Sequence, residues 1–184
     1  MALILASQSP RRRELLSLIT EDFTVRVSDA DETVDPSMSP KETVEYLARI
    51  KGEAVFSLHP EDTVISADTI VVLGNRILGK PHSREEAFSM LSALSGKTHE
   101  VYTGVCILSP SEKISFSQRT EVTFCSLTED DINNYIDTNE PFDKAGGYGI
   151  QGKGAVLIKG IVGDYYNVMG LPVAELSGRL KKFL

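Results

Sequence analysis

LILASQSPRRRELL, residues 3–16, is typical of a short strand followed directly by a helix, and the rest of the chain is interpreted outward from it. Residues 3–6 are apolar and too few for a helix, which predicts a buried strand. Ser9 is a typical N-cap and Pro10 a typical first helical residue, so we expect a helix to begin there. The side chains expected to turn toward the core are Leu15, Leu16, Leu18 and Ile19.

Three consecutive arginines, residues 11–13, fall in the first turn of this expected helix. Backbone N–H groups already make a helix start positive, so cations are disfavoured there unless an anion is bound. Two interpretations follow: an anion site to which Arg11 and Arg12 contribute, or a solvated basic helix end. The helix dipole favours the anion site.

The composition is that of a globular protein, with 184 residues, 41% hydrophobic and 24% charged. This length predicts a single domain over residues 1–184, with room for two lobes. No apolar run is long enough for a membrane span, and the first 20 residues hold three arginines, so a cytoplasmic protein without membrane association is expected. The net charge of −7 argues against binding a nucleic acid polymer, but not against a small phosphorylated substrate.

A second helix is expected from Ser39, because SPKE at residues 39–42 is a capping box with proline at the first helical position. Lys51 falls on the same side of this helix as its apolar residues. A lysine there either extends to the edge of the apolar face or points into a cleft, and the pattern leaves both open. The apolar residues are Val44, Leu47, Ala48, Val55 and Leu58.

TVISADTIVVL, residues 63–73, is the most strand-like segment, and its branched apolar residues predict a strand buried on both faces in an α/β sheet. Asp68 and Thr69 interrupt it. An ionised carboxylate in such a run is costly unless it is paired, hydrogen-bonded or bound to a metal. Asp68 is therefore the strongest single functional candidate, and the alternative is a structural carboxylate that caps a neighbouring loop.

DKAGGYGIQGKG, residues 143–154, contains five glycines and is expected to be a loop in which the backbone closely approaches another group. Gln151 lies within it, and we expect residues 155–159 to form a strand after it. Lys80 lies in GKP, residues 79–81, at the end of another short expected strand.

The charged groups at expected strand ends and loops suit phosphoryl or nucleotidyl chemistry. Cations neutralise a polyphosphate, carboxylates hold Mg²⁺ through oxygen, and one carboxylate can take a proton from water. P-loop and G-x-S-x-G motifs are lacking, and the three histidines show no zinc-ligand spacing, so each is interpreted as a surface or internally satisfied residue. The cations are Arg11, Arg12, Lys51, Lys80 and Lys144, and the carboxylates are Asp31, Glu32 and Asp68.

The chain resembles the Maf family of nucleotide pyrophosphatases over essentially its whole length. The resemblance rests on short strings in the family's order: LASQSPRR, the DE of the acidic loop, the lysine of LARIKGEA, ADT, GKP, LSG, KAGGYGIQG and GLP. It implies an α/β fold like that of the inosine triphosphatase group, with a mixed twisted sheet flanked by helices and two lobes around a central cleft. It also implies hydrolysis of a nucleoside triphosphate to the monophosphate and pyrophosphate with Mg²⁺ or Mn²⁺, commonly by a homodimer.

The resemblance further implies roles for individual residues. Asp68 matches the family's proton acceptor, and Glu32 is assigned with Asp68 to the divalent metal. The positions tied to substrate choice are Arg11, Thr69 and Gln151, and the side chains assigned to phosphate are Ser7, Arg12, Lys51 and Lys80.

The strings ADT and GIQG resemble the branch of the family that acts on dTTP and UTP, and modified pyrimidine triphosphates are expected substrates as well. A sister branch acts on 7-methyl-GTP and has a charged residue in place of Gln151. A further alternative is a non-catalytic, nucleotide-sensing regulator of septum formation, a process with which the family has been linked. The presence of Asp68, Glu32 and both Lys51 and Lys80 favours an enzyme.

Overall fold

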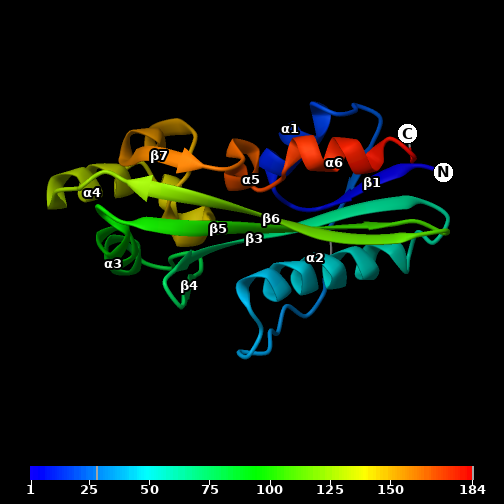
Figure 1. The fold of residues 1–184 in the computed structure, drawn as a ribbon, viewed down its shortest axis with the longest axis horizontal. Helices are drawn as coiled ribbons and strands as arrows, with labels where there is room; N and C mark the ends of the chain where they lie inside the picture. The colour runs from blue at the N-terminus through cyan, green and yellow to red at the C-terminus, as the bar shows by residue number, and fades with distance from the viewer. Residues whose placement is uncertain (28, 184) are drawn as a thin grey trace. The chain divides into compact units, whose positions relative to one another are not determined.

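Within residues 1–27 and 29–183, which this computed structural model describes, seven strands form one mixed sheet in the order β2-β1-β3-β5-β6-β7, with β4 paired to β3 (Figure 1). The strands are β1 (Leu3–Ala6), β2 (Thr24–Arg26), β3 (Thr63–Leu73), β4 (Arg76–Leu78), β5 (Thr98–Leu108), β6 (Lys113–Phe124) and β7 (Ile158–Val162). The helices are α1 (Pro10–Ser17), α2 (Pro40–Phe56), α3 (Arg84–Leu94), α4 (Glu129–Ile136), α5 (Tyr165–Met169) and α6 (Val173–Leu180), with short 3₁₀ helices η1 (Glu140–Asp143), η2 (Ala145–Gly147) and η3 (Gly152–Leu157). The predicted α/β class with a mixed sheet is confirmed.

The chain divides into two compact units, which are described separately. The first unit comprises Met1–Thr69, Thr103–Gln118 and the chain from Gly170 onward, and the second comprises Ile70–Tyr102 and Arg119–Met169. The chain passes between units inside β3, β5 and β6. That both units belong to a single domain over residues 1–184 stays a prediction.

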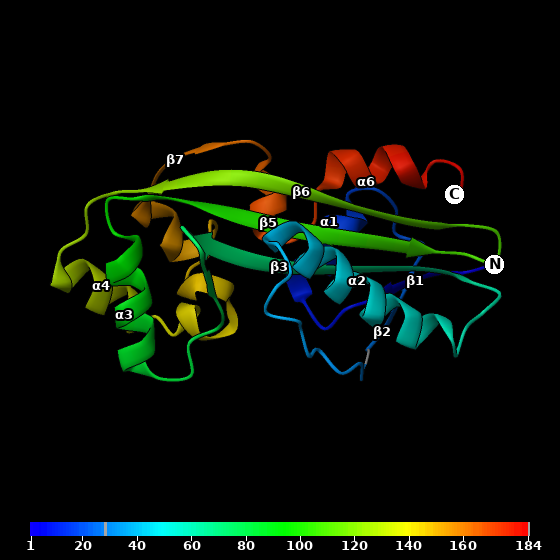
Figure 2. The same cartoon turned by 60° about the horizontal axis from the view of Figure 1, so that its bottom comes forward.

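In the first unit, β1 lies between β2 and β3 and is parallel to both. Ser9 caps α1 by accepting the Arg12 N–H, and Pro10 is the first helical residue, so the predicted start of this helix is confirmed. The helix α2 covers one face of the strands, whereas α1 and α6 lie on the opposite face (Figures 1 and 2).

Two glycines allow α2 to lie very close to the sheet. A Cβ on Gly104 of β5 would be 2.3 Å from the Val44 carbonyl oxygen, and a Cβ on Gly52 of α2 would be 2.6 Å from Ser66 Oγ of β3. Neither position has room for a side chain, and the first would clash with backbone that cannot move aside. The approach of α2 to β3 and β5 therefore depends on glycine at both positions.

Three predictions about the ends of elements are wrong. Leu18 and Leu58 are exposed rather than buried, because α1 ends at Ser17 and α2 at Phe56. The strand expected at residues 155–159 begins only at Ile158, since η3 occupies the preceding residues.

In the second unit, β4 pairs antiparallel with β3, and β7 pairs antiparallel with β6. The helix α3 lies beside α4 (Figure 2), where Arg84 donates to Asp137 Oδ1 at 2.6 Å and to Asn133 Oδ1 at 3.0 Å. Gly96, with φ +68°, follows α3 and supplies the left-handed residue that commonly ends a helix.

The core of the second unit contains a buried histidine. His99 on β5 has its Nε2 2.6 Å from the Tyr148 hydroxyl, and its ring packs edge-to-face against Tyr148 and Phe124. Burial lowers the pKa of His99 to about 4 and raises the pKa of the Tyr148 hydroxyl. His99 therefore belongs to the core, as expected for a histidine without catalytic partners.

This buried histidine predicts a loss of stability in acid. The pKa of His99 is lower when folded than its ordinary 6.5, so its contribution is complete above pH 6.5 and is lost as the pH falls toward 4. This pKa shift corresponds to about 3 kcal/mol in the free energy of unfolding. We expect urea unfolding to show that wild-type protein loses roughly this much more stability between pH 7 and pH 4 than His99→Gln, which keeps a hydrogen-bonding side chain. Parallel pH dependences would contradict the assignment.

Candidate functional site

Lys51 joins two carboxylates in the first unit. Its Nζ lies 2.6 Å from Asp68 Oδ1 and 3.0 Å from Glu32 Oε2. The Lys51 and Asp68 side chains are only 16% and 13% exposed, whereas Glu32 is 55% exposed. Lys51 therefore points to Asp68 rather than extending to the solvent edge of α2, and the carboxylate in β3 has the partner that its burial requires.

The position of Lys51 follows from the packing of α2. Lys51 precedes Gly52, the helix residue that lies against Ser66 of β3, and Asp68 is two residues farther along the same strand. Side chains two residues apart in a strand point to the same face. A residue larger than glycine at position 52 would hold this turn of α2 away from the face that carries Asp68.

Arg12 is fixed next to this ion pair by two hydrogen bonds. Its Nε–H donates to the Gly170 carbonyl oxygen at 2.8 Å, and its Nη2–H donates to Thr69 Oγ1 at 3.0 Å. Burial lowers the pKa of Arg12, and the nearby Asp68 carboxylate acts in the opposite direction. Because the guanidinium group has five N–H donors, these bonds are compatible with phosphate binding by Arg12. We call Arg12, Glu32, Lys51, Asp68 and Thr69 the Asp68 cluster.

The Thr69 hydroxyl has a second partner in the first unit. Thr69 Oγ1 lies 2.9 Å from Thr103 Oγ1, and Thr103 is fully buried on β5. Thr69 accepts from Arg12, so its hydroxyl either donates to Thr103 or accepts a second hydrogen from it. The direction of that bond decides whether Thr69 offers a ligand an acceptor or a donor.

Ser7 lies in the turn between β1 and α1, and Arg11 follows at the start of α1. Ser7 is buried, and its Oγ accepts the Ser9 N–H at 3.1 Å. Arg11 is half-buried in the first turn of α1, directly before Arg12. The structure thus places these residues where helical N–H groups favour an anion, and an anion-binding role for them stays a prediction.

Lys80 and Gln151 lie in the second unit, on two loops that contact each other. The Gly146 N–H donates to the Gly79 carbonyl oxygen at 2.9 Å, which ties the glycine-rich loop to the loop that carries Lys80. Lys80 is exposed and Gln151 is half-buried. That both act on the same substrate as Asp68 stays a prediction.

The two carboxylates of the Asp68 cluster fit a divalent metal that is completed by other ligands. Among the described residues, no three His, Cys, Asp or Glu side chains are grouped closely enough to hold a metal by themselves. Mg²⁺, however, usually keeps several waters and takes one or two carboxylates together with substrate phosphates. Asp68 and Glu32, which share Lys51 as a partner, match that donor set.

Sequence reasoning did not identify two contacts of this site. Thr103 interrupts an apolar strand as a buried polar residue, which is the same signal that singled out Asp68. Gly170 contributes only its carbonyl oxygen to Arg12, and no side-chain pattern marks such a contact.

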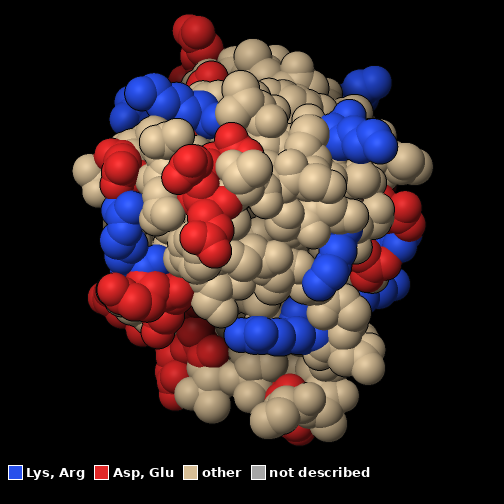
Figure 3. Space-filling view, turned by 90° about the vertical axis from the view of Figure 1, so that its left-hand side faces the viewer, with Lys and Arg blue, Asp and Glu red and all other residues tan. Residues whose placement is uncertain are grey.

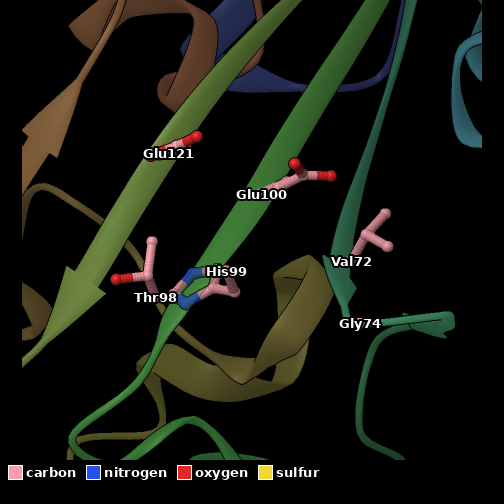
Figure 4. A pocket seen from close by; sticks show the side chains of 6 residues that line it. All are labelled: Val72, Gly74, Thr98, His99, Glu100 and Glu121. Atoms are coloured by element: carbon pink, nitrogen blue, oxygen red, sulfur yellow. The ribbon is translucent and has the colours of Figure 1, made fainter.

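A separate hollow of about 250 Å³ in the second unit contains none of the predicted site residues (Figure 4). It is lined by Val72, Gly74, Thr98, His99, Glu100 and Glu121. Both of its carboxylates are bound by Arg119, whose Nε–H donates to Glu100 at 2.7 Å and whose Nη2–H donates to Glu121 at 2.7 Å. Both carboxylates of the hollow are therefore already paired with Arg119, and no function is assigned to the hollow.

The charges on the face shown in Figure 3 are mixed. Among the described residues drawn there, acidic and basic side chains form separate small groups among uncharged ones rather than one continuous basic surface. No helix within residues 1–27 and 29–183 has the length and apolar character needed to cross a membrane.

Comparisons with known proteins give the family and the fold of this chain. The family described as "Maf-like protein" matches residues 2–183. A dTTP/UTP pyrophosphatase of Bacillus cytotoxicus is 55% identical over 98% of this chain and 94% of its own length, and one of Bacillus velezensis is 52% identical over 98% and 96%. The structure of the Staphylococcus aureus Ham1 protein covers 99% of both chains with a TM-score of 0.57 at 16% identity, which shows a shared fold.

Proposed function

The chain belongs to the family of Maf-like proteins, and from this membership we propose that it is a pyrophosphatase that hydrolyses dTTP and UTP to the monophosphate and pyrophosphate. The observation that carries the proposal is the ion pair of Lys51 with Asp68 and Glu32, beside Arg12 and Thr69. It brings together the side chains that we propose as proton acceptor, metal ligands and phosphate-binding cations. Modified pyrimidine triphosphates are included as substrates, which gives the enzyme a role in cleaning the nucleotide pool.

Asp68 is proposed to accept the proton of a water that attacks the α-phosphorus. Lys51 contacts Oδ1 of Asp68, and we assign proton transfer to Oδ2 of the same carboxylate. Arg12, Lys51 and Lys80 neutralise charge that accumulates on the departing pyrophosphate, while Ser7 offers its hydroxyl to a phosphate oxygen.

Asp68 and Glu32 are the residues that would hold Mg²⁺ or Mn²⁺. A metal bound there supplies charge stabilisation to the phosphates and lowers the pKa of a bound water. The mixed charges and the net charge of −7 support a nucleotide rather than a nucleic acid polymer as the ligand. We also propose that the protein is a homodimer in the cytoplasm and does not associate with a membrane.

Base selection is assigned to Arg11, Thr69 and Gln151. Uracil and thymine present two carbonyl acceptors on either side of one N–H donor, and a glutamine amide both donates and accepts. A site built on such bonds rejects a mismatched base because buried polar groups are then left without partners. Thr69 and Gln151 favour this specificity over 7-methyl-GTP, whose branch has a charged residue at the glutamine position.

A panel of nucleoside triphosphates assayed for pyrophosphate release tests the proposed function. We expect rapid hydrolysis of dTTP and UTP and slow hydrolysis of ATP, GTP and 7-methyl-GTP. Gln151→Glu should lower dTTP turnover and reduce the preference for dTTP over GTP by roughly 5- to 150-fold, because an ionised carboxylate has no hydrogen to donate. Equal hydrolysis of purine and pyrimidine nucleotides by the wild-type enzyme would refute the proposal, as would absence of hydrolysis.

A further inference from the structure

We propose that Glu140 and Tyr135 are positioning residues that hold both ends of the 149–154 segment and thereby orient Gln151 for base selection. The inference rests on the proposed function, because Gln151 matters only if it contacts the base. It concerns the second unit alone, and the contacts below are all within that unit.

Glu140 holds the end of the segment that follows Gln151. Its Oε1 accepts the Lys153 N–H at 3.0 Å, and its Oε2 accepts the Gly154 N–H at 3.3 Å. Hydrogen bonds to an ionised carboxylate are about twice as strong as those between neutral groups. One half-buried side chain thus fixes two consecutive peptide groups within three residues of Gln151.

Glu140 reaches these peptide groups because the chain reverses directly before it. Asn139, which follows α4, has φ +62° and is the only described residue other than glycine with a left-handed backbone. Asparagine tolerates this conformation better than most residues. The reversal directs the chain from α4 back toward the glycine-rich loop and begins η1 at Glu140.

Tyr135 holds the other end of the segment. Its hydroxyl oxygen accepts the Gly149 N–H at 3.1 Å, and its ring is buried in the core of the second unit. Burial, together with the charge of the Glu140 carboxylate, raises the pKa of Tyr135 to about 12. The hydroxyl therefore stays protonated at neutral pH, and its contact with Gly149 does not change over the range in which the enzyme would be assayed.

The two ends of the segment touch each other. A Cβ on Gly154 would be 2.2 Å from the Gly149 carbonyl oxygen and 2.8 Å from the Tyr135 hydroxyl. Gly152 has φ +65°, and a Cβ there would be 2.8 Å from Glu140 Oε1. Residues 149–154 therefore form a closed turn with Gln151 near its middle, and glycine is needed at positions 152 and 154, where a side chain would meet Glu140, Tyr135 or the Gly149 carbonyl oxygen.

We call the hydrogen bonds of Glu140 and Tyr135 to this turn the clamp. The clamp acts on recognition of the base rather than on the chemical step. Neither Glu140 nor Tyr135 needs to touch the substrate, because the Glu140 carboxylate and the Tyr135 hydroxyl bond to peptide groups of the turn and to each other. A small displacement of a positioning group is enough to lower the rate with the correct substrate. Loss of the clamp should therefore weaken discrimination between bases in the same direction as loss of Gln151 itself.

The test compares Glu140→Ala, Glu140→Gln and Tyr135→Phe with Asp130→Asn, a matched control that changes an exposed carboxylate on α4. We expect Glu140→Ala to lower both kcat/KM for dTTP and the ratio of dTTP to GTP turnover by roughly 10-fold, the effect of about one charged hydrogen bond. Glu140→Gln, which keeps an acceptor oxygen, should lose less, and Asp130→Asn should match the wild type. In a Gln151→Ala background, Glu140→Ala should cause no further loss of selectivity.

Amide hydrogen exchange supplies a readout that does not depend on activity. The Lys153 and Gly154 amides should exchange faster in folded Glu140→Ala than in the wild type, and the Gly149 amide should exchange faster in Tyr135→Phe. Unchanged selectivity in Glu140→Ala, an equal loss with dTTP and GTP, or unchanged exchange at these amides would each overturn the inference while leaving the proposed function intact. A wild-type enzyme without pyrimidine preference would instead refute the proposed function, even if the exchange results showed the clamp.

Discussion

Asp68→Asn is expected to lower kcat with dTTP by about 10²-fold or more, on the scale of acid–base and metal contributions, while the protein stays folded. The substitution keeps the size and shape of the side chain but removes its charge. An amide neither takes a proton from water nor holds a divalent metal as a carboxylate does. Lys51 keeps Glu32 as a partner, so the first unit loses only one of the two ionic contacts of that lysine.

The measurement is kcat and KM for dTTP beside a thermal melt of the same preparation. Glu61→Gln is the matched control, because Glu61 is an exposed carboxylate two residues before the start of β3. We expect its kinetics to equal those of the wild type. Turnover near the wild-type value in folded Asp68→Asn would show that Asp68 is a structural carboxylate after all.

Lys51→Ala should reduce kcat/KM by about 10²-fold, the typical scale for a group that stabilises transferred charge. Lys51 is the shared partner of Asp68 and Glu32, so its removal leaves two neighbouring carboxylates without their common cation. Lys51→Arg keeps the charge, but its planar group does not reproduce the compact ammonium, and a partial loss is expected.

Lys41→Ala is the control on the same helix. Lys41 is an exposed residue of α2, and its Nζ lies 4.0 Å from Glu45 Oε1. Such surface pairs contribute about 0–1 kcal/mol to the free energy of unfolding. We expect its kinetics and melting temperature to change little. If steady-state kinetics cannot distinguish Lys51→Ala from Lys41→Ala, Lys51 has no part in handling phosphate.

The starts of helices were predictable because their signals are local. Ser9 with Pro10 and the Ser39 capping box each place a hydrogen-bonding side chain within a few residues of the groups it serves. The ends were less predictable. The helical spacing of apolar residues extends to Leu18 and Leu58, beyond the last residues of α1 and α2, and both side chains are exposed. No residue type marks the last turn of either helix.

For the candidate site, the sequence indicated Asp68 because a charge inside an apolar strand is costly, but it did not indicate the partner. The contact with Lys51 depends on how near α2 lies to β3, and that distance is set by Gly52 and Gly104. The contact of Arg12 with the Gly170 carbonyl oxygen involves a peptide group, which every residue has. Such long-range contacts follow from the assembled fold and not from spacing along the chain.

The bond between Arg12 and Gly170 spans 158 residues of sequence and has a consequence for how the protein folds. The first unit is assembled from three separate segments of the chain, and the one that begins at Gly170 supplies the carbonyl partner of Arg12. Bringing residues so far apart in sequence together costs loop-closure entropy before the contact can stabilise the chain, which slows folding. Until these segments meet, the folding chain carries an incomplete Asp68 cluster.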